Sequence, residues 1–147
     1  MTFDDEYLQV EQVTAMPRPE QSGGVPIWVS GTLNPRVLER IVRFGAGWVP
    51  WGPDAEDIAA GIRRIREVLS DAGRDPERFE VAGGLPTRTD GDGNVDVDAT
   101  MQEVPALVDA GITDFRIGRL PEDPDAAQEQ LTAIVAAFRR AVGRDRE

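Results

Sequence analysis

Four short apolar runs recur along the chain, and each one ends in glycine or proline. Each run is about as long as a β-strand and is rich in β-branched or aromatic residues near its start. The runs are Pro26–Gly31, Gly47–Gly52, Phe79–Pro86 and Phe115–Pro121. This pattern predicts four β-strands and places Trp48 in the core.

A segment with helical periodicity follows each predicted strand. The first begins at Asn34–Pro35, an N-cap residue with proline at the first helical position, and ends at Gly45. The other helices are expected at about 53–72, 98–110 and 123–142, and Pro105 predicts a kink or a late start in the third. A glycine after each helix is expected to supply a left-handed conformation before the chain continues.

Strands that alternate with helices in this way form a parallel sheet with right-handed crossovers. The predicted fold class is therefore α/β, with residues 26–143 as one domain of four β/α units. Residues 1–25 do not follow the pattern and are expected to be extended. Within them Val10–Val13 is a candidate short strand, and the prolines of Met16–Pro19 disfavour a helix. Residues 144–147 are expected to form a C-terminal tail.

Charge and residue types narrow the chemistry. The 147 residues include 16 basic and 27 acidic side chains, a formal net charge of -11, which opposes binding to nucleic acid or to an anionic membrane. The chain has no Cys and no His, and every basic residue is Arg. No catalytic residue and no metal site are therefore predicted, and a bound cofactor is the more natural source of reactivity. A signal peptide and a membrane span are both absent from the pattern, so a cytoplasmic protein is expected.

The strongest candidate site is the segment Ser30–Pro35, where the first strand ends and the first helix begins. Gly31 allows close approach of the backbone, and the hydroxyl groups of Ser30 and Thr32 lie beside free amides of the first helical turn. Such donors form sites for phosphate groups. The same sequence also fits a capped helix without a ligand.

Three further side chains are candidates. Trp51 follows the second strand, where it would stack on a flat ring, wall a pocket or pack as core. Arg88 and Arg116 are candidate substrate-binding residues, and solvated arginines fit the sequence as well. Arg116 alternates with apolar neighbours in the fourth strand, so it is expected to point to the opposite face from them.

The stretch Asp90–Asp96 matches the middle of a calcium-binding loop. The first and last ligand positions of such a loop would be Arg88 and Ala99, which cannot anchor the ion through a carboxylate. An acidic turn between strand and helix is therefore expected.

Five short pieces, in order along the chain, resemble the luciferase-like monooxygenase family, the flavin- and deazaflavin-dependent (β/α)8-barrel oxidoreductases. They are Pro17–Gln21, Pro26–Gly31, Gly45–Trp51, Ala72–Pro76 and Ala110–Asp114. The resemblance runs from about Phe3 to Val142 but corresponds only to the C-terminal half of the family. It implies a parallel-stranded half of a (β/α)8 TIM barrel, about four β/α units with an irregular N-terminal segment.

By this resemblance, Ser30, Gly31 and Thr32 would help to hold the phosphate of FMN or of the 5-deazaflavin coenzyme F-420. Trp51 and Gly52 would lie near the cofactor and the substrate mouth, at the face where barrel enzymes place their sites. The chain departs from the family pattern in two places. Ser30 replaces the first glycine of the usual pair, and Ala46 replaces the usual aspartate, so the loop contacts are expected to differ.

Half a barrel leaves two open sheet edges and an apolar inner face that the other half would cover. We therefore expect a homodimer or a complex with a complementary half-barrel, and a small-molecule substrate. Two functions stay open. In the first, the assembled barrel is an oxidoreductase or monooxygenase in which a reduced flavin or deazaflavin transfers hydride or activates oxygen. In the second, the chain is a non-catalytic binding or assembly module that keeps the fold without the redox activity.

Overall fold

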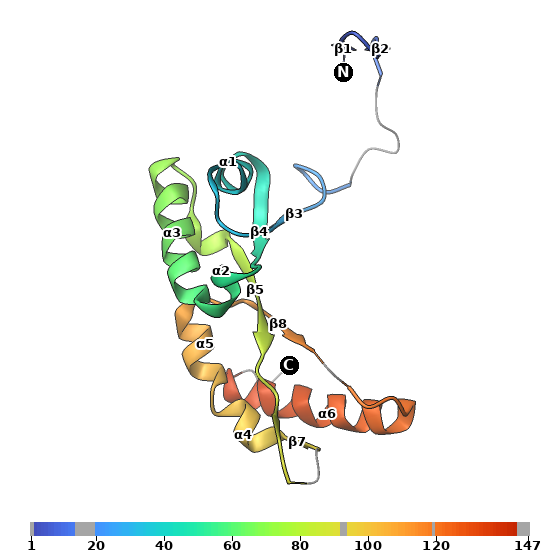
Figure 1. The fold of residues 1–147 in the computed structure, drawn as a ribbon, viewed down its shortest axis with the longest axis vertical. Coiled ribbons are helices and arrows are strands. Elements are labelled where there is room, and N and C mark those ends of the chain that lie inside the picture. The colour runs from blue at the N-terminus through green and yellow to red at the C-terminus, as the bar shows by residue number, and fades with distance from the viewer. Residues whose placement is uncertain (1, 14–19, 92–93, 119, 144–147) are drawn as a thin grey trace.

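A computed structural model describes residues 2–13, 20–91, 94–118 and 120–143. Its centre is a parallel sheet of four strands, in the order β3 (Ile27–Ser30), β4 (Gly45–Val49), β5 (Glu80–Leu85) and β8 (Asp114–Ile117). Helices follow the strands in turn: α1 (Pro35–Phe44), α2 (Pro53–Glu56) with α3 (Ile58–Asp71), α4 (Val97–Met101) with α5 (Val104–Ala110), and α6 (Pro124–Ala141). The predicted α/β class and its repeated β/α unit are confirmed (Figure 1).

The third helical segment starts on time at Val97 and is interrupted just before its proline, which agrees with the predicted kink rather than with a late start. A break after α4 separates the two helices, and Pro105 lies at the start of α5, where its missing N–H costs no intrahelical hydrogen bond. A single 3-10 turn, η1 (Pro76–Arg78), leads from α3 into β5. Among the described residues, no helix is both long enough and apolar enough to cross a membrane.

The sheet is staggered rather than flat. β5 pairs with β4 through Glu80 and Val81, near its start, and with β8 through Ala82–Leu85, nearer its end. In Figure 1 α3 and α5 lie on one side of β5, and α6 crosses below the strands. One covered face and a progressive stagger are the features of a barrel wall.

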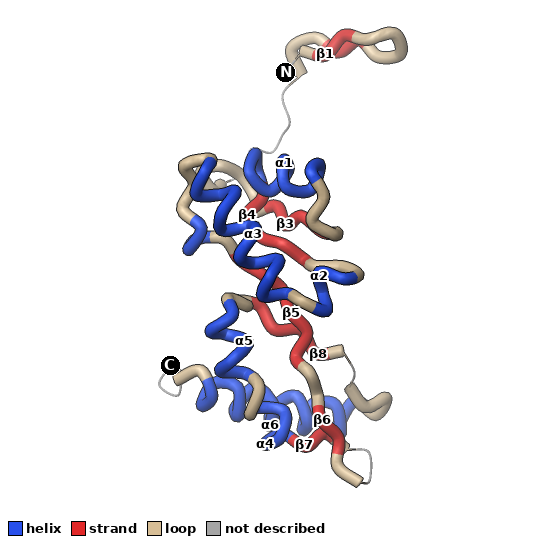
Figure 2. The backbone as a smooth tube through the Cα atoms, turned by 60° about the vertical axis from the view of Figure 1, so that its left-hand side comes forward, coloured by secondary structure: helices blue, strands red, loops and turns tan. Residues whose placement is uncertain are grey.

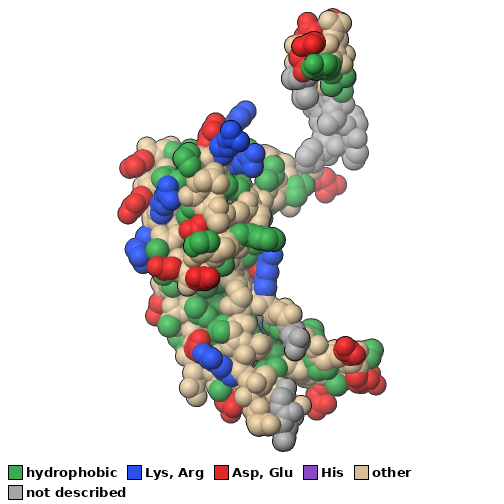
Figure 3. Space-filling model, in the orientation of Figure 1, with side chains coloured by type: hydrophobic (Ala, Val, Ile, Leu, Met, Phe, Trp, Pro, Cys, Tyr) green, Lys and Arg blue, Asp and Glu red, His purple; other side chains and the backbone are tan. Residues whose placement is uncertain are grey.

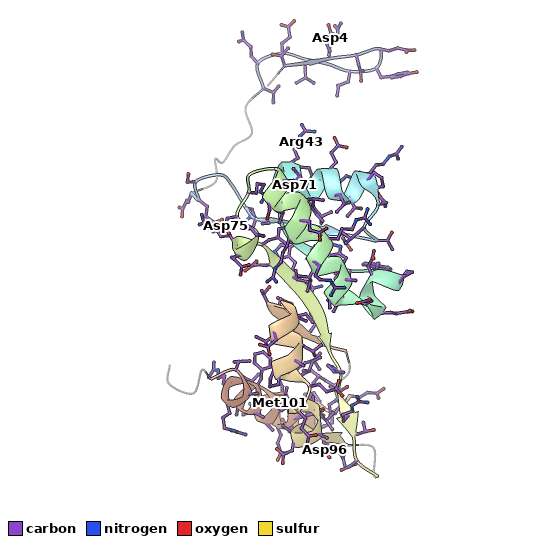
Figure 4. All side chains as sticks on the ribbon, turned by 90° about the vertical axis from the view of Figure 1, so that its left-hand side faces the viewer. Asp4, Arg43, Asp71, Asp75, Asp96 and Met101 are labelled. Atoms are coloured by element: carbon purple, nitrogen blue, oxygen red, sulfur yellow. The ribbon has the colours of Figure 1, made fainter. Side chains whose placement is uncertain are left out.

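Two apolar clusters form the helix-side core. The larger cluster lies between α1, α3 and the strands β3, β4 and β5. It surrounds Trp48, which has no exposed surface. The smaller lies between the end of β5, α4, α5 and α6, and includes Met101 and Ile134. Phe115 of β8 packs against both. Figure 4 shows the same division, with Met101 in the lower group of side chains and Arg43 and Asp71 at the upper end.

The end of α1 differs from its sequence-based prediction. Gly45 has φ -66° and ψ 131°, so it is extended and begins β4 directly, without the predicted left-handed turn. Arg74, which follows α3, instead satisfies the end of α1. Its guanidinium donates to the carbonyls of Ile41, of Val42 at 3.0 Å and of Gly45 at 2.8 Å. A side chain from another β/α unit thus replaces the local cap.

The inner face of the sheet is not apolar, and that expectation is wrong. Val29, Trp48, Val81 and Phe115 point into the helix-side core, so their alternate neighbours point the other way. Those neighbours include Trp28 on the edge strand β3, small residues on the central strands (Gly47, Ala82 and Gly84) and charged residues on the edge strand β8 (Asp114 and Arg116), so the face is mixed. The two sheet edges predicted for half a barrel are present, at β3 and β8.

The N-terminal segment forms a hairpin that lies apart from the sheet in Figures 1 and 2. Its strands, β1 (Phe3–Asp4) and β2 (Gln9–Val10), are antiparallel. The candidate strand Val10–Val13 therefore overlaps β2 only at Val10 and extends three residues beyond it. The proline segment Met16–Pro19 and the tail at 144–147 lie outside the described residues. A second hairpin, β6 (Arg88–Thr89) with β7 (Val95–Asp96), spans the acidic stretch.

Replacing Gly61 of α3 by alanine should destabilise the protein. A methyl group at this position would lie 2.5 Å from a ring carbon of Trp48. We expect the free energy of unfolding to fall by about 1–3 kcal/mol, more than the gain in helix propensity, in urea denaturation. Ser70→Ala on the exposed side of the same helix is the control and should change little. Equal or higher stability of Gly61→Ala would contradict this packing.

Arg74→Lys should also lower the free energy of unfolding, by about 1–3 kcal/mol, because lysine lacks the guanidinium fork that reaches three carbonyls. Arg78→Lys, at the exposed last residue of η1, is the matched control. Thermal unfolding at one protein concentration compares the two. The same melting temperature for both variants would show that Arg74 does not cap α1.

Candidate functional site

Two loops meet at the carboxyl edge of the sheet. The amide of Gly31, after β3, donates to the carbonyl of Val49 at 3.1 Å. The indole N–H of Trp48 donates to the carbonyl of Gly31 at 2.9 Å. A Cβ atom built on Gly52 would lie 3.5 Å from the Thr32 methyl group. The predicted residues of the β3–α1 loop thus lie beside Gly52, which the sequence places 20 residues later.

The amides of the first turn of α1 are already bonded, which differs from the expectation that they are free. The side-chain oxygen of Asn34 accepts from the amides of Arg36 at 3.0 Å and Val37 at 3.1 Å. A carboxylate oxygen of Asp54, from α2, accepts from the amide of Leu33 at 2.6 Å. An internal anion therefore occupies part of the place where a phosphate would bind.

Three donors of the loop remain for a ligand. The Ser30 hydroxyl makes one long contact, 3.4 Å to the carbonyl of Val49. The amide and hydroxyl of Thr32 donate no hydrogen bond within the described part of the chain. Two hydroxyls and an amide fit the edge of a phosphate group, while Asp54 opposes its charge. The positive φ of Gly31, 134°, turns the backbone at this point.

Arg64 of α3 is a residue that sequence reasoning missed. Its guanidinium donates to the carbonyl of Leu33 at 2.9 Å, so it brings a cation next to the loop. No sequence signal marks Arg64, because it lies on α3, 31 residues after Leu33.

Trp51 is 64% exposed, whereas Trp48 is completely buried. Simple core packing, one of the three roles that the sequence allowed for Trp51, is therefore wrong. Its ring stands at the carboxyl edge next to Gly52, where a flat ligand would reach it.

The two candidate arginines lie in different places. Arg116 points to the inner face, where its Cζ atom lies 5.9 Å from the ring centroid of Trp28 and its Nε atom 3.3 Å from Asp114. Arg88 lies beyond the end of β5 and is paired with Glu103. The structure brings Arg116 to the face that also carries Ser30, and leaves Arg88 elsewhere.

Two of the hollows lie on the helix side of the sheet. A cavity of about 360 Å³ lies between α3, α5 and α6, lined by Ile65, Phe79 and Phe115 among others. Another of about 380 Å³ lies between β8 and α6, lined by Ile117 and Val135. Neither is lined by a predicted site residue.

The acidic turn uses its carboxylates locally. Asp90 accepts from the amide of Asn94 at 2.8 Å, and Asp96 caps α4 by accepting from the amide of Ala99 at 2.9 Å. Residues 92–93 of this stretch lie outside the described residues. In the part of the chain that the structure describes, no three acidic side chains are grouped so that they could hold a metal ion.

Comparison with known proteins agrees with this architecture. The family model described as luciferase-like monooxygenase matches residues 1–145. An F420-dependent secondary alcohol dehydrogenase, solved in complex with an F420-acetone adduct, superimposes with a TM-score of 0.65 at 15% sequence identity. The superposition covers 100% of this chain and 56% of that chain. None of the curated proteins matches.

The match to the dehydrogenase shows the fold, and this chain spans little more than half the length of that enzyme. The predicted parallel-stranded half of a β/α barrel is thereby confirmed. The family model covers nearly the whole sequence. This chain belongs to the luciferase-like monooxygenase family.

Proposed function

We propose that this chain is a half-barrel that binds FMN or a 5-deazaflavin and acts as an oxidoreductase when a second half completes the barrel. The observation that carries the proposal is the meeting of the β3–α1 and β4–α2 loops at the carboxyl edge, through the contacts of Gly31 and Gly52. Barrel enzymes place their sites at this edge. Membership of an oxidoreductase family supports the same conclusion.

In this proposal Ser30, Gly31 and Thr32 hold the phosphate of the cofactor through the hydroxyls of Ser30 and Thr32 and the Thr32 amide. Trp51 and Gly52 line the mouth beside it, and the exposed indole provides a flat wall. A bound flavin or deazaflavin supplies hydride transfer or, for a flavin, oxygen activation. The chain itself supplies binding and orientation, which agrees with its lack of His, Cys and Lys.

The substrate is a small molecule, and Arg116 and Arg88 are the proposed contacts to it. Arg116 is the better placed, because it shares the inner face with Ser30. Arg88 is paired with Glu103 and would have to leave that partner to bind an anion.

Either a second copy or a complementary half-barrel completes the structure. The β8 edge presents an apolar hollow against α6, and Ile27 on the β3 edge is 52% exposed on the side that a helix normally covers. In a closed barrel the last helix of one half covers the first strand of the next. Both edges therefore favour closure by another β/α half.

A non-catalytic assembly module is the second candidate. It is favoured by one observation: Asn34 and Asp54 already bond the amides that a phosphate would use. In this case the loop only caps α1, and the edges serve assembly alone.

Titration of the full chain with FMN and with the deazaflavin coenzyme distinguishes the two functions. We expect one of them to bind with a shifted absorbance band, because the ring would leave water and stack near Trp51. Riboflavin lacks the phosphate and should bind to the same site at least about tenfold more weakly than FMN, since the charge-assisted hydrogen bonds to the phosphate are lost. Absence of binding of both cofactors at high micromolar concentration would favour the assembly module.

Asp54→Asn should strengthen FMN binding by about 5- to 10-fold, because it removes a negative charge next to the phosphate. The amide oxygen of asparagine can still accept from Leu33, so the loop keeps its shape. Glu56→Gln removes the same charge from an exposed position of α2 and is the control. Equilibrium dialysis with FMN and riboflavin measures both variants. Equal effects of the two substitutions on FMN would rule out a phosphate at this loop.

A further inference from the structure

Two large side chains from opposite edges of the sheet meet on its inner face. Trp28 comes from β3 and Arg116 from β8, and these strands are separated by β4 and β5. The Arg116 Cζ atom nevertheless lies 5.9 Å from the Trp28 ring centroid. The curvature of the sheet makes this contact possible. Figure 3 shows the inner side of the molecule as a hollow between its upper and lower parts.

Glycines of the two central strands lie below these side chains. A Cβ atom on Gly47 would lie 2.6 Å from a ring atom of Trp28, so only glycine lets the indole lie flat on β4. Gly84, the β5 partner of Arg116 in the register, has no atom within 4 Å of a built Cβ. The floor beside the guanidinium is therefore open, with room for a flat group.

Arg116 retains most of its hydrogen-bonding capacity. Its side chain is 57% exposed, and the contact to Asp114 uses the Nε atom at 3.3 Å. The two terminal nitrogens make no hydrogen bond within the described residues. A planar guanidinium fork is matched to a carboxylate, which it binds through two parallel hydrogen bonds.

The negative net charge of the chain opposes the binding of an anion at Arg116. A chain with a net charge of -11 repels anions, so an anion would be held here by short-range contacts rather than by the field. An aromatic face beside the guanidinium adds stacking for a planar molecule. Asp114 positions Arg116 and also opposes an incoming anion.

We propose that the Trp28–Arg116 pair on the inner face binds a small planar carboxylate. The carboxylate is held by the terminal nitrogens of Arg116, the flat part lies against Trp28 over the open floor at Gly84, and Asp114 is a positioning residue. Calling this ligand the substrate rests on the proposed oxidoreductase function. Binding itself requires neither cofactor nor a second half.

Benzoate is the probe, and benzamide is its neutral counterpart of the same shape. All variants carry Trp51→Phe, so that the tryptophan emission comes from Trp28 and from buried Trp48. Benzoate should change the emission and bind at least about tenfold more tightly than benzamide, since only the anion makes charge-assisted hydrogen bonds. Inorganic phosphate, which is not planar, should bind more weakly than benzoate.

Substitutions then assign the contacts. Arg116→Gln should weaken benzoate binding about tenfold or more, and Arg116→Lys by less, because lysine keeps the charge but not the fork. Arg63→Gln, which removes an exposed cation on the helix side, should have no effect. Asp114→Asn should tighten benzoate binding severalfold, a change opposite in sign to that expected if Asp114 were needed only for folding. Trp28→Phe should abolish the emission change.

The results separate this proposal from the cofactor proposal. Benzoate binding without FMN or deazaflavin binding would sustain the carboxylate site and refute the proposed cofactor. Cofactor binding with equal affinity for benzoate and benzamide, or with no response to Arg116→Gln and Arg116→Lys, would overturn the carboxylate site. Lowered stability of Arg116→Gln with unchanged benzoate affinity would also overturn it, and would assign the Arg116–Trp28 contact to sheet curvature alone.

Discussion

The indole of Trp48 connects the core of this protein to its candidate site. Its ring fills the centre of the larger apolar cluster and lies against Gly61 of α3. Its N–H donates to the carbonyl of Gly31, in the loop at the carboxyl edge. A buried indole needs such a partner, because an unbonded N–H in the core would be costly. The packing of α3 on the sheet and the shape of the β3–α1 loop are therefore set by one side chain.

Completion of the barrel requires partners for the two edge strands, β3 and β8, more than it requires a cover for the core. The helix side of the sheet is packed within the chain, and the inner face carries a mixture of small, charged and aromatic residues. What the chain leaves unpaired is the backbone of β3 and β8 and the apolar side chains beside them. Strand edges of this kind are paired or covered in folded proteins. An added half would bring strands to both edges and enclose the Trp28–Arg116 pair.

The carboxyl edge contains two opposing features. The β3–α1 loop offers hydroxyl groups and a turned backbone, which suit a phosphate. Asp54 places a carboxylate on the same loop, and Arg64 places a cation beside it. In the proposed function, the balance between these two charged side chains sets how well the loop can hold a phosphate. Neither charge belongs to the loop itself.

The sequence by itself determined the four strands of the parallel sheet, the helical segments that follow them, the buried position of Trp48, the cap at Asn34 and the family, because these depend on local periodicity, capping chemistry and short motifs. The tertiary structure decided the contacts that join distant segments: Arg74 on the end of α1, Asp54 on Leu33, and Arg116 over Trp28. Each joins residues from different β/α units, and no local pattern records which units become neighbours. The mixed character of the inner face was missed for a related reason. Which face of a strand is covered by helices depends on how the whole sheet curves, and that is settled only when the units pack together.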